Sequence, residues 1–375
     1  MDENPNAFKH LLGATAVARI EAAVTAAAPD FDAAAFHRSL EDLGTLELKQ
    51  RVSRLADALV AGLRRPYPEL AAAIVRALPP PVDPDVPNQF GFWIWPLVHV
   101  VGREGLEHPE LALDALRELT QRFSAEFDVR PYLVRYPELT LARLRSWVTH
   151  PDKNVRRLVS EGTRPRLPWG ERLPAFVRDP SPTLPLLEAL RNDPSEFVRR
   201  SVANHLGDIA KDHPDLVVAT LARWLDTETP PSRELLALAR HAARHLIKVG
   251  HPGALALFGH AAPSHVRAAL RLEQSSVVIG HAVCFEATVT NEGQASVTAA
   301  VDYAIRFANA AGALTRRKVF KLAERRLEPG AAASITKRHP MRPVSIRALF
   351  PGAHVLELQV NGVVLAEVPF TLAAP

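Results

Sequence analysis

The sequence contains little that could crosslink the chain or place it in a membrane. Cys284 is the only cysteine among 375 residues, so an intrachain disulfide framework and a cysteine-based metal site are excluded. No apolar run approaches the ~18 residues of a membrane span. The nearest, 92–101, is short and interrupted by Pro96 and His99. The first residues, MDENPNAF, have neither a basic nor an apolar segment, so we expect no signal peptide and a cytoplasmic protein without a membrane partner.

Motifs for the common cofactors are also missing. The chain has no P-loop, no glycine-rich dinucleotide turn and no GxSxG elbow. Fifteen histidines are present, yet no HExxH or other metal-ligand spacing occurs; His241 and His245 are four residues apart without an evident third ligand. Cys284 falls in an expected strand, which makes it a poor candidate nucleophile. Nothing in the sequence therefore indicates a bound metal or nucleotide cofactor.

Positive charge is concentrated in two regions. The net charge is only +4, but residues 122–205 hold 15 Lys and Arg against 10 Asp and Glu, and residues 265–375 hold 13 against 8. The rest of the chain is therefore net acidic. This distribution is typical of a surface that faces phosphates, although ordinary solvated arginines would produce the same count.

A helical repeat is recognisable in the middle of the chain. HPDKNVRRLVSEGTRPRLPW at 150–169 recurs in altered form as NDPSEFVRRSVANHLGDIAKDHPD at 192–215, and Val155 and Val198 are 43 residues apart. A period of ~40–47 residues is typical of HEAT-type repeats. X-Pro turns recur between the helical segments, and proline suits the first turn of a helix. This rhythm predicts a stacked α-solenoid rather than a closed bundle.

Two changes of pattern divide the chain. Five prolines within 78–87 cannot lie inside a helix, so this stretch is predicted to be a linker or a long loop. After Ser264, apolar residues alternate with polar ones over 283–289 and 301–307, which predicts strands. Asn361-Gly362 stands between two such runs and is a strong signal for a hairpin turn.

These patterns predict a multidomain α + β protein. Its first domain, 1–264, would be an α-solenoid of HEAT-like repeats. Its second, 265–375, would be a small immunoglobulin-like β-sandwich, because short strands with frequent turns suit that fold. A barrel is the alternative for the second domain.

Three sets of polar residues fall at helical spacing. We expect each set to share one face of a helix, because residues four apart are neighbours on a helix surface. Stacked repeats would then bring the three faces together on the concave wall of the solenoid. The alternative is a solvated helix face with weak ion pairs. The three sets are Arg122, Glu126 and Arg130; Arg157 and Glu161; and Arg200, Asn204 and Asp208.

A loop rich in arginine and proline follows Glu161. It contains Arg164 and Arg166 and ends in Trp169. A tryptophan presented beside a basic face can stack on a base or sugar; a core-capping tryptophan is the alternative. The order of Arg157 and Glu161 is the less favourable one for helix stability, which favours a function for this pair.

Short basic clusters also occur in the C-terminal domain. We expect them to flank strand ends, either as a second set of phosphate contacts or as solubilising loops. The clusters are Arg316, Arg317 and Lys318; Arg325 and Arg326; and Lys337, Arg338 and His339.

At these residues the chain resembles the AlkC branch of the AlkC/AlkD DNA alkylation repair glycosylases, which are built from HEAT-like repeats. The resemblance is carried by FSAEF at 123–127, by the string at 150–169 and by SVANHLGDIAKDHPD at 201–215, and it covers roughly 4–260. The C-terminal domain is similar, in pattern only, to the immunoglobulin-like domain that some AlkC proteins carry.

The resemblance implies a function in base excision repair. The reaction would be hydrolysis of the N-glycosidic bond of alkylated bases, 3-methyladenine first and 3-methylcytosine as a further candidate, without flipping the base into a pocket. Glu126, Glu161 and Asp208 would be catalytic, with Trp169 lining the lesion and Arg157 nearby. The expected partner is double-stranded DNA containing alkylated bases, bound by a monomer.

This chemistry needs few catalytic groups. An N3-alkylated adenine is cationic and leaves as a neutral base, so a general acid is largely unnecessary. The sugar develops oxocarbenium character, which a carboxylate can stabilise while it orients a water molecule. An undamaged neutral base would gain less from such carboxylates, which supplies selectivity. No metal or organic cofactor is required.

Further residues are expected to bind the DNA. A second hypothesis is a non-catalytic HEAT-repeat scaffold that binds DNA or protein, since both architectures are common interaction modules. The expected DNA-binding residues are Trp169, Arg157, Arg122, Arg130, Arg164, Arg166, Arg200, Asn204, Arg316, Arg317, Lys318, Lys337 and Arg338.

Overall fold

Helices occupy the chain from Phe8 to Ala256, and strands follow from Val266, as the change of pattern predicts. Contacts divide the chain into two units, Met1–Asp212 and His213–Pro375, which are described separately. The computed structural model describes residues 7–81, 88–227, 230–260, 262–342 and 348–374. Residues 82–87 of the predicted linker lie outside these ranges.

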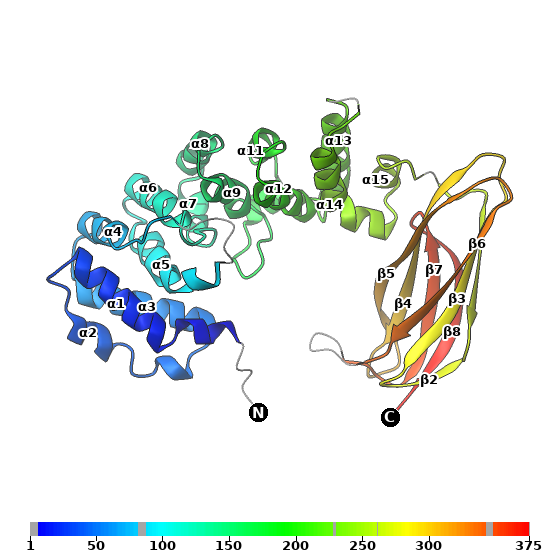
Figure 1. Cartoon of the computed structure of the whole chain (residues 1–375), viewed down its shortest axis with the longest axis horizontal. Helices are drawn as coiled ribbons and strands as arrows, with labels where there is room; N and C mark the ends of the chain where they lie inside the picture. The colour runs from blue at the N-terminus through cyan, green and yellow to red at the C-terminus, as the bar shows by residue number, and fades with distance from the viewer. Residues whose placement is uncertain (1–6, 82–87, 228–229, 261, 343–347, 375) are drawn as a thin grey trace. The chain divides into compact units, whose positions relative to one another are not determined.

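The first unit consists of short helices joined by turns. Its elements are η1 (Phe8–Leu12), α1 (Ala14–Ala27), α2 (Ala33–Arg38), η2 (Leu43–Thr45), α3 (Leu48–Leu63), α4 (Tyr67–Arg76), η3 (Asn88–Ile94), α5 (Trp95–Glu104), α6 (Pro109–Thr120), α7 (Arg130–Arg135), α8 (Pro137–Trp147), α9 (Lys153–Gly162), α10 (Pro174–Arg178), α11 (Leu184–Leu190) and α12 (Glu196–Ile209). In Figure 1, α4, α6, α8 and α11 lie along one side of a row, and α5, α9 and α12 lie along the other. The predicted α-solenoid of HEAT-like repeats is confirmed.

The two copies of the sequence repeat form successive helices of this row. Val155 lies in α9 and Val198 in α12, and both side chains are fully buried. α12 packs against α9 and buries Val198, Val202 and Leu206, which are spaced by four residues. Each fully buried side chain of this size stabilises the fold by roughly 1.5–3 kcal/mol. The offset of 43 residues therefore corresponds to one step of the solenoid.

The first arginine of each Val-Arg-Arg sequence donates hydrogen bonds to the turn that precedes its helix. Arg156 Nη1 donates to the carbonyl of His150 at 2.8 Å and to that of the following proline at 2.9 Å. Arg199 Nη1 donates in the same way to the carbonyls of Asp193, at 2.6 Å, and of the proline after it, at 2.9 Å. Of each Arg-Arg pair, only the second residue, Arg157 or Arg200, is therefore available for a role other than holding this turn.

In the described residues of the second unit, three helices are followed by strands. They are α13 (Pro214–Leu225), α14 (Arg233–Val249), α15 (Pro252–Ala256), β1 (Val266–Leu272), β2 (Ser276–Val278), β3 (Ala282–Asn291), β4 (Val297–Ala308), β5 (Leu314–Leu327), β6 (Ala332–Pro340), β7 (Gly352–Val360) and β8 (Val363–Ala373). The strands form two sheets, in the orders β1-β3-β6 and β2-β8-β7-β4-β5. Neighbours pair antiparallel, except for the parallel pair of β2 and β8.

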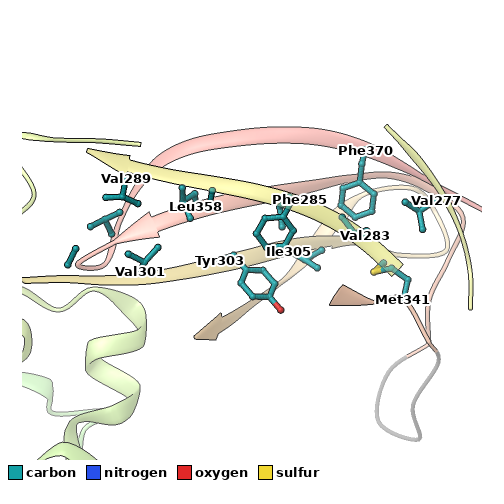
Figure 2. Packing of buried hydrophobic residues seen from close by; sticks show 14 of the residues in the cluster. Val277, Val283, Phe285, Val289, Val301, Tyr303, Ile305, Met341, Leu358 and Phe370 are labelled. Carbon is teal, nitrogen blue, oxygen red and sulfur yellow. The ribbon is translucent and has the colours of Figure 1, made fainter. Parts of the chain in front are cut away.

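Side chains from both sheets meet in one apolar core (Figure 2). Phe285 of β3 and Tyr303 of β4 contact edge to face, with 5.0 Å between their ring centroids. Alternate residues of β3 and β4 are buried, so the predicted alternation over 283–289 and 301–307 is confirmed. Two facing sheets make this domain an immunoglobulin-like sandwich, not a barrel.

The predicted hairpin is also present. Asn361 and Gly362 join β7 to β8 with φ angles of 44° and 80°. A two-residue turn of this kind requires a positive φ at both positions, which is why Asn-Gly is favoured there. Asn361 Oδ1 also accepts a hydrogen bond of 2.7 Å from the Ala300 amide, which ties the turn to β4.

The last helices group with the sandwich. Gly250 ends α14 with a φ of 82°, and a Cβ placed on it would lie 2.5 Å from the Gly362 carbonyl oxygen. Gln359 Nε2 donates to the Lys248 carbonyl at 3.0 Å. The contact-based division therefore falls after Asp212, whereas helices give way to strands near Ser264. The functional division into 1–264 and 265–375 stays a prediction.

Candidate active site

Three carboxylates from separate parts of the first unit are joined through arginines. Glu126 lies on the loop between α6 and α7, Glu161 near the end of α9, and Asp208 near the end of α12. Arg157 contacts Glu126 and Glu161, and Arg164 contacts Glu161 and Asp208. We refer to these five residues as the acid–arginine cluster. Glu161 and Asp208 are only 5% and 3% exposed, so the cluster reaches well into the protein.

Arg157 organises the outer end of the cluster. Its Nη1 donates to Glu126 Oε2 at 2.8 Å and to Ser124 Oγ at 3.1 Å, and its Nη2 lies 3.5 Å from Glu161 Oε1. The guanidinium carbon lies 4.6 Å from the centroid of the Phe197 ring, a cation–π contact. Glu126 Oε1 makes no hydrogen bond within the part of the chain that the structure describes. That oxygen can therefore accept a hydrogen bond from water without losing a protein contact.

Glu161 is held in its ionised form. Burial by itself raises the pKa of this carboxyl, but the charges of Arg157 and Arg164, together with hydrogen bonds from Ser201 and Arg164, outweigh burial and hold the pKa below its ordinary value. Ser201 Oγ donates to Oε2 at 2.6 Å, and Arg164 Nη1 donates to Oε1 at 2.7 Å. Glu161 therefore carries its negative charge at neutral pH.

Arg164 links Glu161 to Asp208. Its Nε donates to Asp208 Oδ2 at 2.8 Å, and Lys211 Nζ donates to Asp208 Oδ1 at 2.9 Å. Burial opposes the charged form of Arg164, but the two carboxylates more than offset this and raise its pKa. Arg164 is 7% exposed and directs its guanidinium at the acids, and the expectation that it binds DNA stays a prediction. With Lys211, the cluster contains three negative and three positive groups.

A neutral histidine lies beside the cluster on α12. His205 is fully buried, with its Nδ1 3.0 Å from the carbonyl oxygen of Ser160. Burial lowers the pKa of His205 to about 4, so the ring is neutral at physiological pH. The neutral ring can donate to this carbonyl, which lies in the last turn of α9, where carbonyls lack helical partners. Its Nε2 has no hydrogen-bond partner among the described residues.

The expected stripe of Arg122, Glu126 and Arg130 on one helix is wrong. α6 ends at Thr120 and α7 begins at Arg130, so a loop carries Glu126. The Thr120 hydroxyl accepts a hydrogen bond of 3.3 Å from the Ala125 amide, one of the contacts that replace a helical hydrogen bond here. Spacing by four residues therefore does not mean a shared helix face in this segment.

Arg130 clamps the loop that follows α9. Its Nη1 donates to the carbonyls of Gly162 and Arg164, each at 2.9 Å, and its Nε and Nη2 donate to the Glu171 carbonyl, the former at 2.9 Å. Burial lowers its pKa to about 10, so it stays charged at neutral pH. Arg122 likewise donates to two backbone carbonyls. Both guanidinium groups donate to backbone carbonyls, and the expectation that they also contact DNA stays a prediction.

Trp169 is presented to solvent on this clamped loop. Its exposed fraction is 58%, which excludes the core-capping alternative. Its φ of 63° is a left-handed conformation that costs a non-glycine residue on the order of 1–3 kcal/mol and clusters at functional sites. Lys49 Nζ donates to its carbonyl, and its ring contacts Phe8 edge to face at 6.1 Å. The backbone of Trp169 is therefore held in place, and its ring contacts Phe8 while it stays accessible.

Other expected DNA-binding residues of this unit lie at the surface. Arg200 has a side chain that is 64% exposed and only a long contact, 3.8 Å, with Glu196. Asn204 is half-buried one turn later on the same helix. Arg166 pairs with Asp212 through its Nε, at 2.8 Å, and its Nη2, at 2.7 Å. Arg200 is the most exposed cation of the three expected stripes.

The basic clusters of the sandwich lie near strand ends, as expected, but within the strands and not in loops: 316–318 near the start of β5, 325–326 near its end and 337–339 near the end of β6. β5 and β6 are edge strands, and charged side chains on an edge discourage pairing with other chains. Arg317 is anchored by Glu357 Oε2 at 2.7 Å and by Gln359 Oε1 at 2.9 Å. The exposed basic residues among the expected DNA contacts are Arg316, Arg317 and Lys318 on β5 and Lys337 and Arg338 on β6.

Sequence reasoning missed several side chains that hold the acids. Ser124 and Ser201 donate to Glu126 and Glu161, and Lys211 donates to Asp208. One signal was present: Ser201 precedes Asp208 by two helical turns, which places both on one face of α12. The serine and lysine contacts otherwise depend on tertiary packing.

A further pair joins the loop that carries Glu126 to α5: Asp128 lies on this loop and His99 on α5. His99 Nδ1 and Asp128 Oδ1 are 2.8 Å apart, and Asp128 is 5% exposed.

Within the described ranges, no group of three or more His, Cys, Asp and Glu residues is placed to hold a metal ion. No helix in those ranges is long and apolar enough to cross a bilayer.

Two family models match the chain. The model described as DNA alkylation repair enzyme matches residues 123–246, which contain the whole acid–arginine cluster. The model of the C-terminal immunoglobulin-like domain of the uncharacterised protein YhaZ matches residues 266–374. Fold and cluster together define a helical-repeat protein of the DNA alkylation repair class that carries an immunoglobulin-like domain.

Two relatives match over nearly their whole length. The solved structure of Pseudomonas fluorescens alkylpurine DNA glycosylase AlkC, bound to DNA containing an abasic site analog, is 33% identical with a TM-score of 0.89, covering 98% of this chain and 100% of that one. The uncharacterised protein YhaZ of Bacillus subtilis is 35% identical over 352 residues, which are 91% of this chain and 92% of that protein. The chain belongs to the AlkC family of HEAT-like-repeat DNA alkylation repair proteins.

Proposed function

We propose that the protein is a DNA glycosylase that hydrolyses the N-glycosidic bond of cationic alkylated bases in double-stranded DNA. The first substrate would be 3-methyladenine and the second 3-methylcytosine, and the protein would act as a monomer in base excision repair. The observation that carries the proposal is the meeting of Glu126, Glu161 and Asp208 in one cluster beside basic residues. The relative AlkC, named as an alkylpurine DNA glycosylase and solved with DNA, supports it.

The cluster would act on the sugar. As the bond to the base breaks, the sugar gains positive charge. At ~4 Å and an effective dielectric constant of ~20, one carboxylate stabilises a unit positive charge by about 4 kcal/mol. Arg157, Arg164 and Lys211 balance the charge of the three acids. The net stabilisation of the sugar therefore depends on which carboxylate oxygen lies nearest to it. Glu126 Oε1, which accepts no hydrogen bond among the described residues, is the oxygen best placed to hold the attacking water, while Glu161 and Asp208 add negative charge.

The surface around the cluster would bind the duplex. Arg200 and Asn204 would contact phosphates, while Arg157 would hold Glu126 in place near the lesion. Trp169 stands on an exposed loop, where its ring can touch a lesion that is still stacked in the duplex. This exposure supports a reaction in which the base is not flipped. Selectivity follows from charge, since a cationic nucleotide gains more from the acids than a neutral one does.

The sandwich would add phosphate contacts through β5 and β6. Arg316→Glu combined with Lys318→Glu, in the full-length chain, tests this. We expect DNA binding about tenfold weaker at low salt, with a shallower salt dependence. The full chain is needed because α14 contacts the β7–β8 turn, so removing the sandwich would uncover that helix. Unchanged affinity would contradict a role of these residues in DNA binding.

A non-catalytic scaffold is the second candidate. It is favoured by the balance of charge within the acid–arginine cluster, which a purely structural ion network would also show. Incubation of the protein with methylated duplex DNA separates the two candidates. The glycosylase proposal expects free 3-methyladenine in solution and abasic sites in the DNA. DNA binding with a steep salt dependence but without base release would favour the scaffold.

A further inference from the structure

A ladder of aromatic rings connects Trp169 to the loop that carries Glu126. Each ring contacts the next, so the two ends belong to one packed cluster. The last ring, Phe127, is the chain neighbour of Glu126. In order, the rings are Trp169, Phe8, Phe92, Phe123, Trp95 and Phe127, with successive centroids 6.1, 5.6, 5.5, 5.6 and 5.4 Å apart.

Phe8 occupies an unusual place in this ladder. It stacks on Phe92, yet 52% of it is exposed. The helix that carries it, η1, is anchored without that exposed face: Leu12 is fully buried, and the Lys9 carbonyl accepts a hydrogen bond of 3.0 Å from the buried Arg51. The outer face of the Phe8 ring is therefore not required to hold η1 in place.

Phe8 and Trp169 form a fixed aromatic surface. Single exposed apolar side chains are ordinary, but here two large rings in contact are each more than half exposed. Trp169 is held by its left-handed backbone conformation and by Lys49, whose ammonium group donates to the Trp169 carbonyl. Lys49 is itself exposed. The surface thus combines flat apolar faces with a neighbouring positive charge.

We propose that Phe8 is a DNA-contacting residue, which η1 supplies to the site, and that Phe8 and Trp169 together support the strand that contains the lesion. Bases and sugars offer flat apolar faces flanked by phosphates, and an aromatic pair beside a lysine complements that combination. The inference rests on the proposed function, because that function makes duplex DNA the occupant of this surface. It adds a residue that lies outside the acid–arginine cluster and outside residues 123–246.

The test measures binding of full-length variants to duplex DNA with a stable abasic-site analogue, and to the same duplex without it. We expect Phe8→Ala to bind the abasic duplex about tenfold more weakly, which is in the lower range for loss of an aromatic contact with a nucleotide. Phe8→Leu, which keeps bulk but not the flat ring, should recover only part of this. Leu11→Ala is the matched control, since Leu11 lies on the same helix and is 39% exposed; it should bind as the wild type does.

Three results would overturn the proposal. They are wild-type affinity of Phe8→Ala, full recovery by Phe8→Leu, and an equal loss in Leu11→Ala. Thermal unfolding of each variant shows whether it is folded, and Phe8→Leu carries the comparison if Phe8→Ala does not fold. The readout is binding and not base release, so an inactive wild-type protein would refute the proposed function while the contribution of Phe8 to DNA binding is still measured.

Discussion

Replacement of Arg130 by lysine separates two roles that this arginine could have. Lysine keeps the positive charge, so a simple phosphate contact would be largely retained. It cannot reproduce the planar fork through which Arg130 reaches the carbonyls of Gly162, Arg164 and Glu171. The substitution therefore removes the clamp on the Trp169 loop and leaves the charge.

The size of the effect follows from the hydrogen bonds lost. A hydrogen bond to a charged group contributes about 1.5–3 kcal/mol, and a lysine ammonium can replace at most part of this set. Loss of two such bonds at a site that is 3% exposed should lower the free energy of unfolding by about 3–6 kcal/mol. For a unit of this size, the unfolding temperature should fall by roughly 10 °C.

Two assays read the outcome. Thermal unfolding measures stability, and DNA binding at several salt concentrations measures the number of phosphate contacts. For Arg130→Lys we expect a large fall in unfolding temperature with an unchanged salt slope. Arg200→Ala should have the opposite effect. Its side chain is 64% exposed, so the unfolding temperature should not change. The slope of the logarithm of the binding constant against the logarithm of the salt concentration should become shallower by about one. Wild-type stability of Arg130→Lys would refute the clamp.

Two further predictions concern His205 and the α14–sandwich contact. The pKa of His205 is about 4 in the folded protein, against an ordinary 6.5. The stability that comes from keeping this ring neutral, about 3 kcal/mol, is fully present above about pH 6.5 and is lost as the pH falls toward 4. Denaturant unfolding from about pH 7 to about pH 4.5 should show this loss, and His205→Gln should remove it; equal acid sensitivity in both proteins would contradict the assignment. A Cβ on Gly362 would lie 1.9 Å from Gly250 Cα, whereas Gly330, with a similar φ, has open space around it. Gly362→Ala should therefore lower the unfolding temperature clearly more than Gly330→Ala, and equal effects would speak against the close approach.

The parts of the fold set by local sequence could be predicted. Alternation of apolar residues in β3 and β4 fixes which face is buried, because successive strand residues point to opposite sides. Asn361-Gly362 fixes the hairpin, because few other residue pairs adopt its φ angles. The Val155–Val198 offset reveals α9 and α12 because both helices bury the same apolar face.

The parts set by distant contacts could not be predicted. Arg130 has the composition of a surface residue, and only backbone carbonyls more than thirty residues away turn it into a buried clamp. The loop that carries Glu126 has a spacing that also suits a helix, and tertiary contacts decide between the two. Phe8 carries no motif; its contact with Trp169 joins residues far apart in the chain.

The most direct test of the account is the single-turnover rate of 3-methyladenine release by carboxylate variants. Glu126→Gln, Glu161→Gln and Asp208→Asn keep the shape of each side chain but remove its charge. Each should lower the rate about 10²–10³-fold, with affinity for abasic-analogue DNA reduced far less. Glu138→Gln, an exposed acid on α8, is the matched control and should react at the wild-type rate. Equal rates in all of these proteins would contradict the claim that the clustered acids stabilise the reacting sugar.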